Sequence, residues 1–379
     1  MERKNHCCHG TGETTSRRGL PHGRYSAHAM FDAINSAEGG YSSYKFKVSA
    51  PSGSSPEAAG VAAAHAVLLK LFPEQKADLD GAFAASLAKI PDGPGKTSGI
   101  SVGEEVAAKI LALRASDGAD APNIYRPVTS PGVYISATLP ISSQWGNLTP
   151  WVMQRSSQFR PAPPPPLTSA AWASDYNEIK ELGSKRSTTR TPEQTDIARF
   201  WILAGPASWE PIVRHLASAP GRTLLQNARL FALVELATAD AYIAVFEAKF
   251  TFNFWRPITA IRNGDIDGND ATTRVADWEP TIDTPLHPEY PCAHCITSAA
   301  ARAVLESEFG TGPIPPFTMT SPTAPGVTRK WTSVKDWADE ISAARIYGGI
   351  HYRNSTVVGQ AMGKQIGELT VQNFLKPIK

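Results

Sequence analysis

The residues best suited to chemistry gather between Lys249 and His351. Lys249, Arg256 and Arg345 supply fixed positive charge, while His294 and His351 supply imidazoles that can bond an electrophilic atom or move a proton. Lys249 and Arg256 are seven residues apart, so on one helix both heads would reach from the same face. Aromatic and small residues surround these charges, which favours partial burial, and a buried charge needs a partner. The pattern therefore predicts a pocket for a tetrahedral oxyanion such as phosphate or vanadate.

Each part of this pattern also has a simpler interpretation. A Lys and an Arg at this spacing usually mark a solvated helix face, and a lone His in an apolar segment is more often a hydrogen-bonded core residue. The oxyanion hypothesis depends on the combination. It fails if Lys249 or Arg345 lies on a solvated face remote from His351.

Three short segments carry a family resemblance. They are Lys249-Phe-Thr-Phe-Asn-Phe-Trp-Arg-Pro257, Pro291-Cys-Ala-His294 and Ala344-Arg-Ile-Tyr-Gly-Gly-Ile-His351. Together they resemble the K-x6-R-P, P-S-G-H and S-R-x5-H signature of the vanadium-dependent haloperoxidases and of their relatives, the acid phosphatases of the type 2 phosphatidic acid phosphatase superfamily. The first segment matches fully, and its Phe-Trp-Arg-Pro ending is similar to the haloperoxidase branch. Cys292, Ala293 and Ala344 depart from the family's Ser, Gly and Ser.

The resemblance implies a vanadate cofactor, whose site phosphate can also occupy. Lys249, Arg256 and Arg345 would then neutralise the oxygens of the anion, and His351 would be the metal ligand through its Nε2 atom. Hydrogen peroxide would be the oxidant, and the cations would polarise it toward attack by a halide. The resemblance thus implies a haloperoxidase.

The segment around His294 would supply the remaining contacts of this site. The resemblance makes His294 the acid–base residue, Cys292 a weak donor to the anion, and Ala293 a donor through its backbone N–H. His287 aligns with a position at which brominating enzymes tend to carry His and chlorinating enzymes an aromatic residue. Bromide or iodide is therefore the favoured halide, unless His287 is only a loop residue.

The same residues would support a second chemistry, the hydrolysis of a small phosphate ester. In an acid phosphatase His351 would attack phosphorus to form a phosphohistidine, and His294 would protonate the leaving alcohol. The family carries an Asp four residues after the attacking His, but this chain has Ser355 there. Residues that could replace that carboxylate in space are Asp336, Asp339 and Glu340. The missing Asp favours the peroxidase.

Two further classes of protein stay open. The changes at Cys292, Ala344 and Ser355 are compatible with a catalytically decayed relative that keeps the fold and loses turnover. Cys292-Ala-His-Cys295 is a CxxC motif at a helix start, where thiol pKa values fall, as in thiol redox proteins. Such motifs normally lie in a βαβ unit, which this sequence lacks. The two cysteines could also form a disulfide in an oxidising compartment.

Composition and charge limit the partners of this 379-residue chain. Its 37 basic and 35 acidic residues leave a formal net charge of +2, so no global field favours nucleic acid or an anionic membrane. No run approaches the ~18 consecutive apolar residues of a spanning helix. Residues 1–23 lack the apolar region of a secretory signal. We therefore expect a soluble protein, exported if the true N-terminus is longer, and the sequence leaves a homo-oligomer open.

Apolar residues that recur every three or four positions predict an all-α helical bundle. We expect a disordered or aberrant tail over residues 1–25 and one helical domain over residues 26–379, with the oxyanion site contributed by residues 249–355. The resemblance implies a bundle of the vanadium haloperoxidase and type 2 phosphatidic acid phosphatase kind. The predicted helices are Ala27–Ser36, Ala58–Phe72, Glu74–Lys89, Val102–Arg114, Ala170–Leu182, Pro192–Leu203, Leu224–Phe254, Thr297–Phe309, Val334–Tyr347 and Thr356–Leu375.

Three local features shape this bundle. The helix Leu224–Phe254 is apolar on nearly every side, so we expect it at the centre with Lys249 pointing inward. The Pro-rich stretch 118–168 should wrap the surface in extended segments, held to the body by its aromatic residues. No β-rich region is predicted. The last helix has glycines at intervals of four that let another helix approach closely, namely Gly359, Gly363 and Gly367.

Overall fold

The computed structural model describes residues 23–136 and 138–378, and this part of the chain is mainly helical. It contains 12 α-helices, two short 3-10 helices and one two-stranded sheet, which confirms the all-α prediction. The expected tail over residues 1–25 lies almost entirely outside the described residues. The helices are α1 (Gly23–Glu38), α2 (Pro56–Leu71), η1 (Pro73–Gln75), α3 (Lys76–Leu87), α4 (Pro94–Arg114), η2 (Ser143–Asn147), α5 (Ala170–Leu182), α6 (Pro192–Phe200), α7 (Pro206–Ala217), α8 (Leu224–Phe252), α9 (Pro257–Arg262), α10 (Ala293–Phe309), α11 (Val334–Tyr347) and α12 (Arg353–Asn373).

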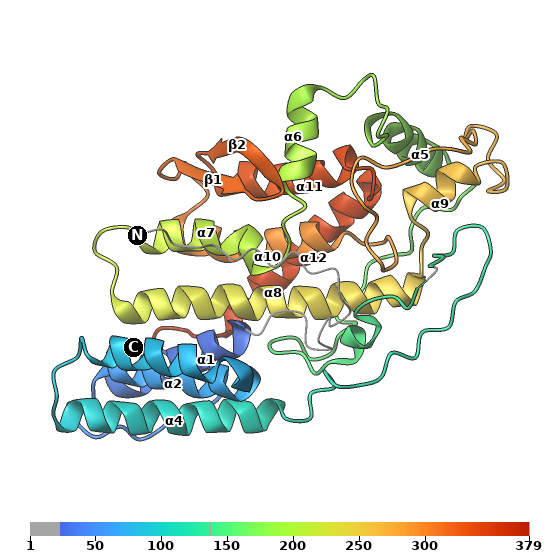
Figure 1. Cartoon of the computed structure of the whole chain (residues 1–379). Helices are drawn as coiled ribbons and strands as arrows, with labels where there is room; N and C mark the ends of the chain where they lie inside the picture. Colours follow the sequence, from blue (N-terminus) through green and yellow to red (C-terminus); the bar gives the residue numbers. More distant parts are fainter. Residues whose placement is uncertain (1–22, 137, 379) are drawn as a thin grey trace.

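Helix α8 runs through the middle of the molecule. It is 29 residues long, and its start is set by a capping box in which Thr223 and Gln226 satisfy each other's backbone N–H groups. Figure 1 shows α8 between a layer of α1, α2 and α4 on one side and α7, α10 and α12 on the other. Because both sides are covered, almost the whole helix is buried, as its apolar sequence predicts.

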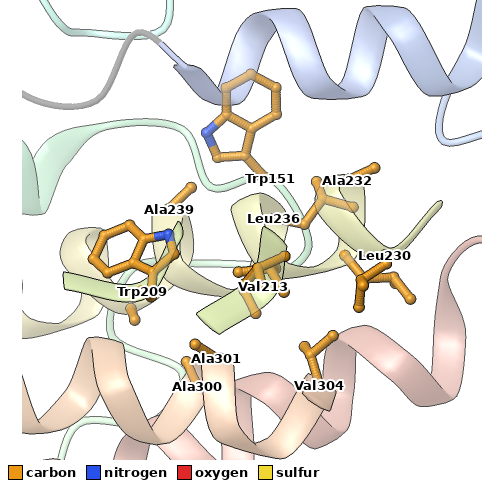
Figure 2. Packing of buried hydrophobic residues seen from close by; sticks show 14 of the residues in the cluster. Trp151, Trp209, Val213, Leu230, Ala232, Leu236, Ala239, Ala300, Ala301 and Val304 are labelled. Atoms are coloured by element: carbon orange, nitrogen blue, oxygen red, sulfur yellow. The ribbon is translucent and has the colours of Figure 1, made fainter. Parts of the chain in front are cut away.

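The main hydrophobic core extends along both sides of α8. Figure 2 shows Trp209 and Val213 of α7 packing with Leu230 and Leu236 of α8, above the small residues Ala300 and Ala301 of α10. On the opposite side Trp151 fills the space between α8 and the first layer of helices. The alanines let α10 approach α8 closely, while Trp151 on one side of α8 and Trp209 on the other fill the remaining volume.

Helices α10 and α12 pack through the glycines of the last helix. A Cβ atom placed on Gly363 would lie only 2.1 Å from the carbonyl oxygen of Ile296, and one on Gly359 would lie 2.8 Å from that of Cys292. Side chains larger than hydrogen would push the two helices apart. The predicted close approach is confirmed, and it joins the helix that begins at Cys292 to the helix that follows His351.

Glycines also explain an error at the start of α4. This helix was predicted from Val102, but it begins at Pro94. A Cβ on Gly99 would lie 2.5 Å from the carbonyl oxygen of Ser55, and one on Gly103 would lie 2.3 Å from that of Ala59. Residues that sequence reasoning treats as helix breakers are here the contact points with α2, and packing outweighs their low helix propensity.

The Pro-rich stretch 118–168 wraps the body and is fastened to α8. Asp240, fully buried on α8, accepts hydrogen bonds from the backbone N–H groups of Trp151, Val152 and Met153 at 2.7, 2.9 and 2.7 Å. The indole of Trp151 is also buried. The expectation that this segment packs on the body is confirmed.

One hairpin departs from the expected loop structure after α10. Strands β1 (Phe317–Ser321) and β2 (Ala324–Trp331) pair in antiparallel fashion, with Phe317 opposite Trp331. The two rings stack with centroids 5.7 Å apart and pack into the main core. Prolines and threonines suggested an irregular loop here, but the buried aromatic pair stabilises a short ladder. Helices α7 and α9 were also missed.

Candidate oxyanion site

Three chain segments meet at the predicted site: the end of α8 with the turn that follows it, residues 287–295, and the connection between α11 and α12. Lys249 is 0% exposed, Arg256 1%, Arg345 2% and His351 1%. Neither Lys249 nor Arg345 lies on a solvated face, so the condition that would have removed the oxyanion hypothesis is not met. Each side chain reaches the site by a different local structure.

Lys249 projects inward from the last turns of α8. Its Nζ atom donates to the carbonyl oxygens of Pro288 and Glu289 at 2.9 and 2.8 Å. These bonds tie the loop before α10 to the central helix. An ammonium group has three N–H donors, so one donor of Lys249 is left for a ligand.

Arg256 reaches the site after a break in the helix, which corrects the expectation that it shares a helical face with Lys249. α8 ends at Phe252, Asn253 follows in the left-handed conformation with φ 48°, and Arg256 is the N-cap residue of α9. Its Nε donates to the carbonyl oxygen of His287 at 2.9 Å, and its Nη1 donates to that of Ile350 at 2.8 Å. Arg256 therefore holds the first and third segments of the signature together.

His287 is a partner of Arg256 and not merely a loop residue. Its Nδ1 atom lies 2.9 Å from Nη2 of Arg256, which can only donate, and 3.1 Å from the carbonyl oxygen of Pro288, which can only accept. Because Lys249 already donates to that carbonyl oxygen at 2.9 Å, we assign Nδ1 as the acceptor for Arg256. The ring is buried and stands edge-on to Phe246, with centroids 5.4 Å apart. The structure places the predicted halide-selectivity residue directly beside a predicted anion-binding cation.

His351 has a carboxylate partner that sequence reasoning missed. Its Nδ1 atom lies 2.7 Å from Oε1 of Glu289, which also accepts from the backbone N–H of Tyr352 at 3.1 Å. With the carboxylate ionised, Nδ1 carries the proton and Nε2 bears the lone pair. Nε2 faces Nη1 of Arg256 at 3.2 Å, which matches that assignment. Nε2 is thus the basic nitrogen that would bond the central atom of a bound oxyanion.

The expected substitutes for the missing Asp lie elsewhere. Glu340 bonds Arg329 at 2.6 Å, Asp339 accepts from Gln360 at 3.1 Å, and Asp336 lies in the capped first turn of α11. Ser355 is within 3.5 Å of His351 Nδ1 but carries no charge. The expectation that His351 lacks a carboxylate was therefore wrong. The sequence did offer a signal for Glu289. It is an acidic residue in a mostly apolar segment, and the three cations predicted to be buried need a counter-charge.

Arg345 and His294 complete the cluster. Arg345 donates from Nη1 to the carbonyl oxygen of Trp201 at 2.5 Å, while its buried Nε has no hydrogen-bond partner among the described residues. His294 is half-buried in the first turn of α10, and its Nε2 lies 3.1 Å from the carbonyl oxygen of Leu203. Since a carbonyl only accepts, Nε2 is the protonated nitrogen and Nδ1 is free to act as a base.

Cys292 does not have the donor role expected of it. Cys292 and Cys295 form a disulfide, and Cys292 Sγ accepts from the backbone N–H of Cys295 at 3.2 Å. The sulfur has no hydrogen left to give to an anion. The N–H groups of Ala293 and His294 in the first turn of α10 precede any helical acceptor, so they are the donors that this segment can offer.

Burial makes the cluster electrostatically demanding. It lowers the pKa of Lys249 well below its ordinary value, lowers the pKa of Arg256 to about 10 and that of Arg345 to about 9, and repulsion among these cations adds to the first and last effects. Burial raises the pKa of Glu289 to about 7. It also lowers the pKa of each imidazole well below its usual range, helped by the nearby cations. Three buried basic side chains thus share one buried carboxyl group, and a bound anion would favour their charged forms.

The remaining donors fit a tetrahedral oxyanion. They are the third N–H of Lys249, the Nε of Arg345 and the first-turn N–H groups of α10, with Nε2 of His351 as the basic nitrogen. Within residues 23–136 and 138–378 no group of three or more His, Cys, Asp or Glu could hold a metal ion. Vanadate held by one His and by cations requires no such group.

Part of the chain is similar in sequence to known proteins. Residues 229–379 match the family model described as the VCPO second helical-bundle domain. Over 173 residues the chain is 29% identical to the vanadium chloroperoxidase of Curvularia inaequalis, which covers 39% of this chain and 28% of that protein. Both matches show that part of this chain is similar to vanadium haloperoxidases. The range of the family model includes the predicted site side chains from Lys249 to His351. The match to the fungal protein spans less than a third of that protein's length.

Solved structures extend the likeness in fold to nearly the whole chain. The first bacterial vanadium-dependent iodoperoxidase aligns with a TM-score of 0.78 and 24% identity over 94% of this chain and 90% of its own. A holo-type bacterial vanadium-dependent chloroperoxidase aligns with a TM-score of 0.74 and 17% identity, over 93% and 90% of the two chains. These likenesses show that the bundle is a vanadium haloperoxidase fold. No helix among the described residues is both long and apolar enough to cross a membrane.

Proposed function

We propose that this protein is a vanadium-dependent haloperoxidase that oxidises bromide or iodide with hydrogen peroxide. The observation that carries the proposal is the arrangement around His351, where Nε2 lies 3.2 Å from Nη1 of Arg256 and where burial, with the nearby buried side chains of Lys249 and Arg345, lowers the pKa of the imidazole. Such a site favours an oxyanion bonded to a neutral imidazole. Similarity to vanadium haloperoxidases supports vanadate as that oxyanion.

Each residue has a distinct role in this proposal. Vanadate, when bound, supplies a Lewis acid that activates peroxide. Lys249, Arg256 and Arg345 hold the anion and stabilise negative charge on its oxygens, and burial strengthens these contacts because water does not screen them. His294, with Nε2 held by a carbonyl, presents Nδ1 to accept or return a proton. Ala293 contributes its backbone N–H.

The preference for bromide or iodide rests on His287. This residue is polar and contacts the guanidinium of Arg256, whereas an aromatic residue at this position is associated with chlorination in the family resemblance. The iodoperoxidase among the similar solved structures is consistent with an easily oxidised halide. Measuring kcat/KM for chloride, bromide and iodide on one vanadate-loaded preparation tests the preference, and a higher value for chloride would contradict it.

The reaction class is tested by two substitutions that should impair vanadate-dependent bromination in different ways. His351→Ala removes the sole ligand bonded to the metal, so we expect vanadate-dependent bromination to disappear. Lys249→Ala removes one charge-assisted contact of roughly 1.5 to 3 kcal/mol, so vanadate should bind about tenfold or more weakly while activity returns at higher vanadate. Bromination that persists in folded His351→Ala protein would refute the assignment of this ligand.

An acid phosphatase is the second candidate, and one observation favours it. The bond from His351 to Glu289 provides the carboxylate that a nucleophilic His requires, so the absence of Asp at position 355 no longer argues against a phosphohistidine. Nε2 of His351 would form the bond to phosphorus, and the bond to the leaving oxygen would break as His294 protonates it; water would then hydrolyse the phosphohistidine. Vanadate-free protein that cleaves a phosphomonoester, is inhibited by vanadate and traps label on His351 after acid quench would support this candidate.

The two weaker classes receive less support from the site. A catalytically decayed relative would show neither halide oxidation nor phosphate-ester hydrolysis, even if vanadate or phosphate bound. Both activity assays would then be negative on correctly folded protein. A thiol redox protein needs an accessible sulfur, but Cys292 and Cys295 are both 0% exposed.

A further inference from the structure

Glu289 has a position that neither family similarity nor the signature segments assign. It comes from the loop before α10, whereas the residue it contacts, His351, lies between α11 and α12. Its side chain is 0% exposed. Burying a carboxylate costs free energy unless it is well bonded, so this placement needs a compensating interaction.

The carboxylate is aimed at the imidazole and not at the neighbouring cations. Lys249 donates to the backbone oxygen of Glu289, and Arg256 donates to the carbonyls of His287 and Ile350 and faces the two imidazoles. The ion pair that this carboxylate forms among the described residues is with Nδ1 of His351 at 2.7 Å. A simple counter-ion would instead pair with a cation.

We infer that Glu289 is the positioning residue that holds the proton of His351 on Nδ1 and orients Nε2 toward the bound oxyanion. It thereby replaces, from another segment of the chain, the carboxylate expected at position 355. The backbone N–H of Tyr352 donates to the same oxygen at 3.1 Å, which favours this orientation of the carboxylate. Outer carboxylates of this kind set the tautomer and basicity of a ligating His. The inference rests on the proposed oxyanion site.

The test uses substitutions that remove, neutralise or move the carboxylate. Glu289→Ala removes it, and Glu289→Gln keeps an acceptor for Nδ1–H without the charge. The double substitution Glu289→Ala with Ser355→Asp moves the carboxylate onto α12, where the Ser355 hydroxyl is 3.5 Å from Nδ1. Glu235→Gln is the matched control, because Glu235, like Glu289, is a buried carboxylate. Glu235 lies on α8, 14 residues before Lys249, which is about 20 Å along the helix.

Two measurements separate the role of Glu289 from that of the site as a whole. Calorimetric titration with orthovanadate gives anion affinity, and 15N spectra of histidine-labelled protein give the His351 tautomer without any ligand. We expect Glu289→Ala to raise the vanadate Kd at least tenfold and to abolish the pure Nδ1–H tautomer. Glu289→Gln should keep the tautomer but raise the Kd several-fold, the double variant should recover to within about threefold of wild type, and Glu235→Gln should change neither property.

Each outcome bears on the inference. A wild-type Kd in either single variant, or Nδ1–H retained in folded Glu289→Ala protein, would overturn it. If Glu289→Ala does not fold, the vanadate Kd of Glu289→Gln provides the affinity test. A folded double variant whose vanadate Kd does not return toward the wild-type value counts against the positioning role of Glu289. If wild-type protein binds vanadate but oxidises no halide, the proposed function fails while the titration and the spectra still decide the role of Glu289.

Discussion

At the scale of single residues, the site depends on which atom each polar group faces. Arg256 bonds two imidazoles and two carbonyl oxygens, so it organises the cluster as much as it offers charge. His287 and His351 are both buried, and each presents a defined nitrogen to that guanidinium. A substitution at either imidazole therefore changes the arrangement of the cation as well as its own chemistry.

The role of His287 can be tested by comparing two substitutions, one that keeps a hydrogen-bond acceptor at this position and one that replaces it with an apolar ring. His287→Phe leaves Nη2 of Arg256 without its acceptor in a buried site, which costs roughly 1.5 kcal/mol or more. We expect affinity for phosphate to fall about tenfold. His287→Gln should restore most of it, because the amide oxygen can accept from the guanidinium. Equal phosphate Kd values for the three proteins, measured by titration calorimetry, would show that Arg256 does not depend on this contact.

At the scale of elements, close helix packing sets the geometry of the site. α10 carries His294 in its first turn, and α12 begins directly after His351. The glycines of α12 bring these two helices into backbone contact, and the backbone N–H of Cys292 bonds the carbonyl oxygen of Ser355 at 3.2 Å. Separation of α10 from α12 would move the acid–base residue away from the ligand residue.

This packing predicts opposite effects for two Gly→Ala substitutions. Gly363→Ala places a Cβ 2.1 Å from the carbonyl oxygen of Ile296, and forcing the helices apart should cost about 1 to 3 kcal/mol of unfolding free energy. Gly81→Ala lies in exposed α3 with no atom within 4 Å of the new Cβ, so higher helix propensity should stabilise by roughly 0.5 to 1 kcal/mol. Urea denaturation measures both. Stabilisation by Gly363→Ala would contradict the close contact.

At the scale of the whole molecule, one central helix joins the core to the site. α8 contacts the first layer through α1 and the second through α10 and α12, and it ends at the cluster of cations. Uncompensated positive charge at the end of α8 opposes folding of the helices on both sides of it. An anion that binds the folded site should therefore stabilise the whole bundle.

Ligand-linked stability tests this statement. Phosphate at about 100 times its Kd should add roughly 2.7 kcal/mol to the unfolding free energy and raise Tm, whereas chloride at the same ionic strength should not. In Lys249→Ala the rise should require more phosphate, because one charge-assisted contact is lost. A Tm that responds equally to chloride and phosphate in thermal scans would show a general salt effect and no specific site.

Local pattern determined most of the helices. The helix predicted from Pro192 is α6, whose observed N-cap is Thr191, and the apolar run of α8 predicted a central helix, because capping and periodicity act within a few residues. Contacts between segments that are distant in the sequence could not be predicted from such local patterns. The early start of α4 and the β1–β2 hairpin both depend on packing against other elements, which outweighs local propensity.

The same division applies to the site. The sequence alone determined Lys249, Arg256, Arg345, His294 and His351, because their types and spacing are fixed along the chain. Only the tertiary structure showed that Arg256 arrives after a helix break and that Glu289 bonds His351. Those two residues are 62 positions apart, and a hydrogen bond depends on folded geometry. Likewise the CxxC spacing left both a disulfide and free thiols open, and the approach of the two sulfurs in the folded chain decided for the disulfide.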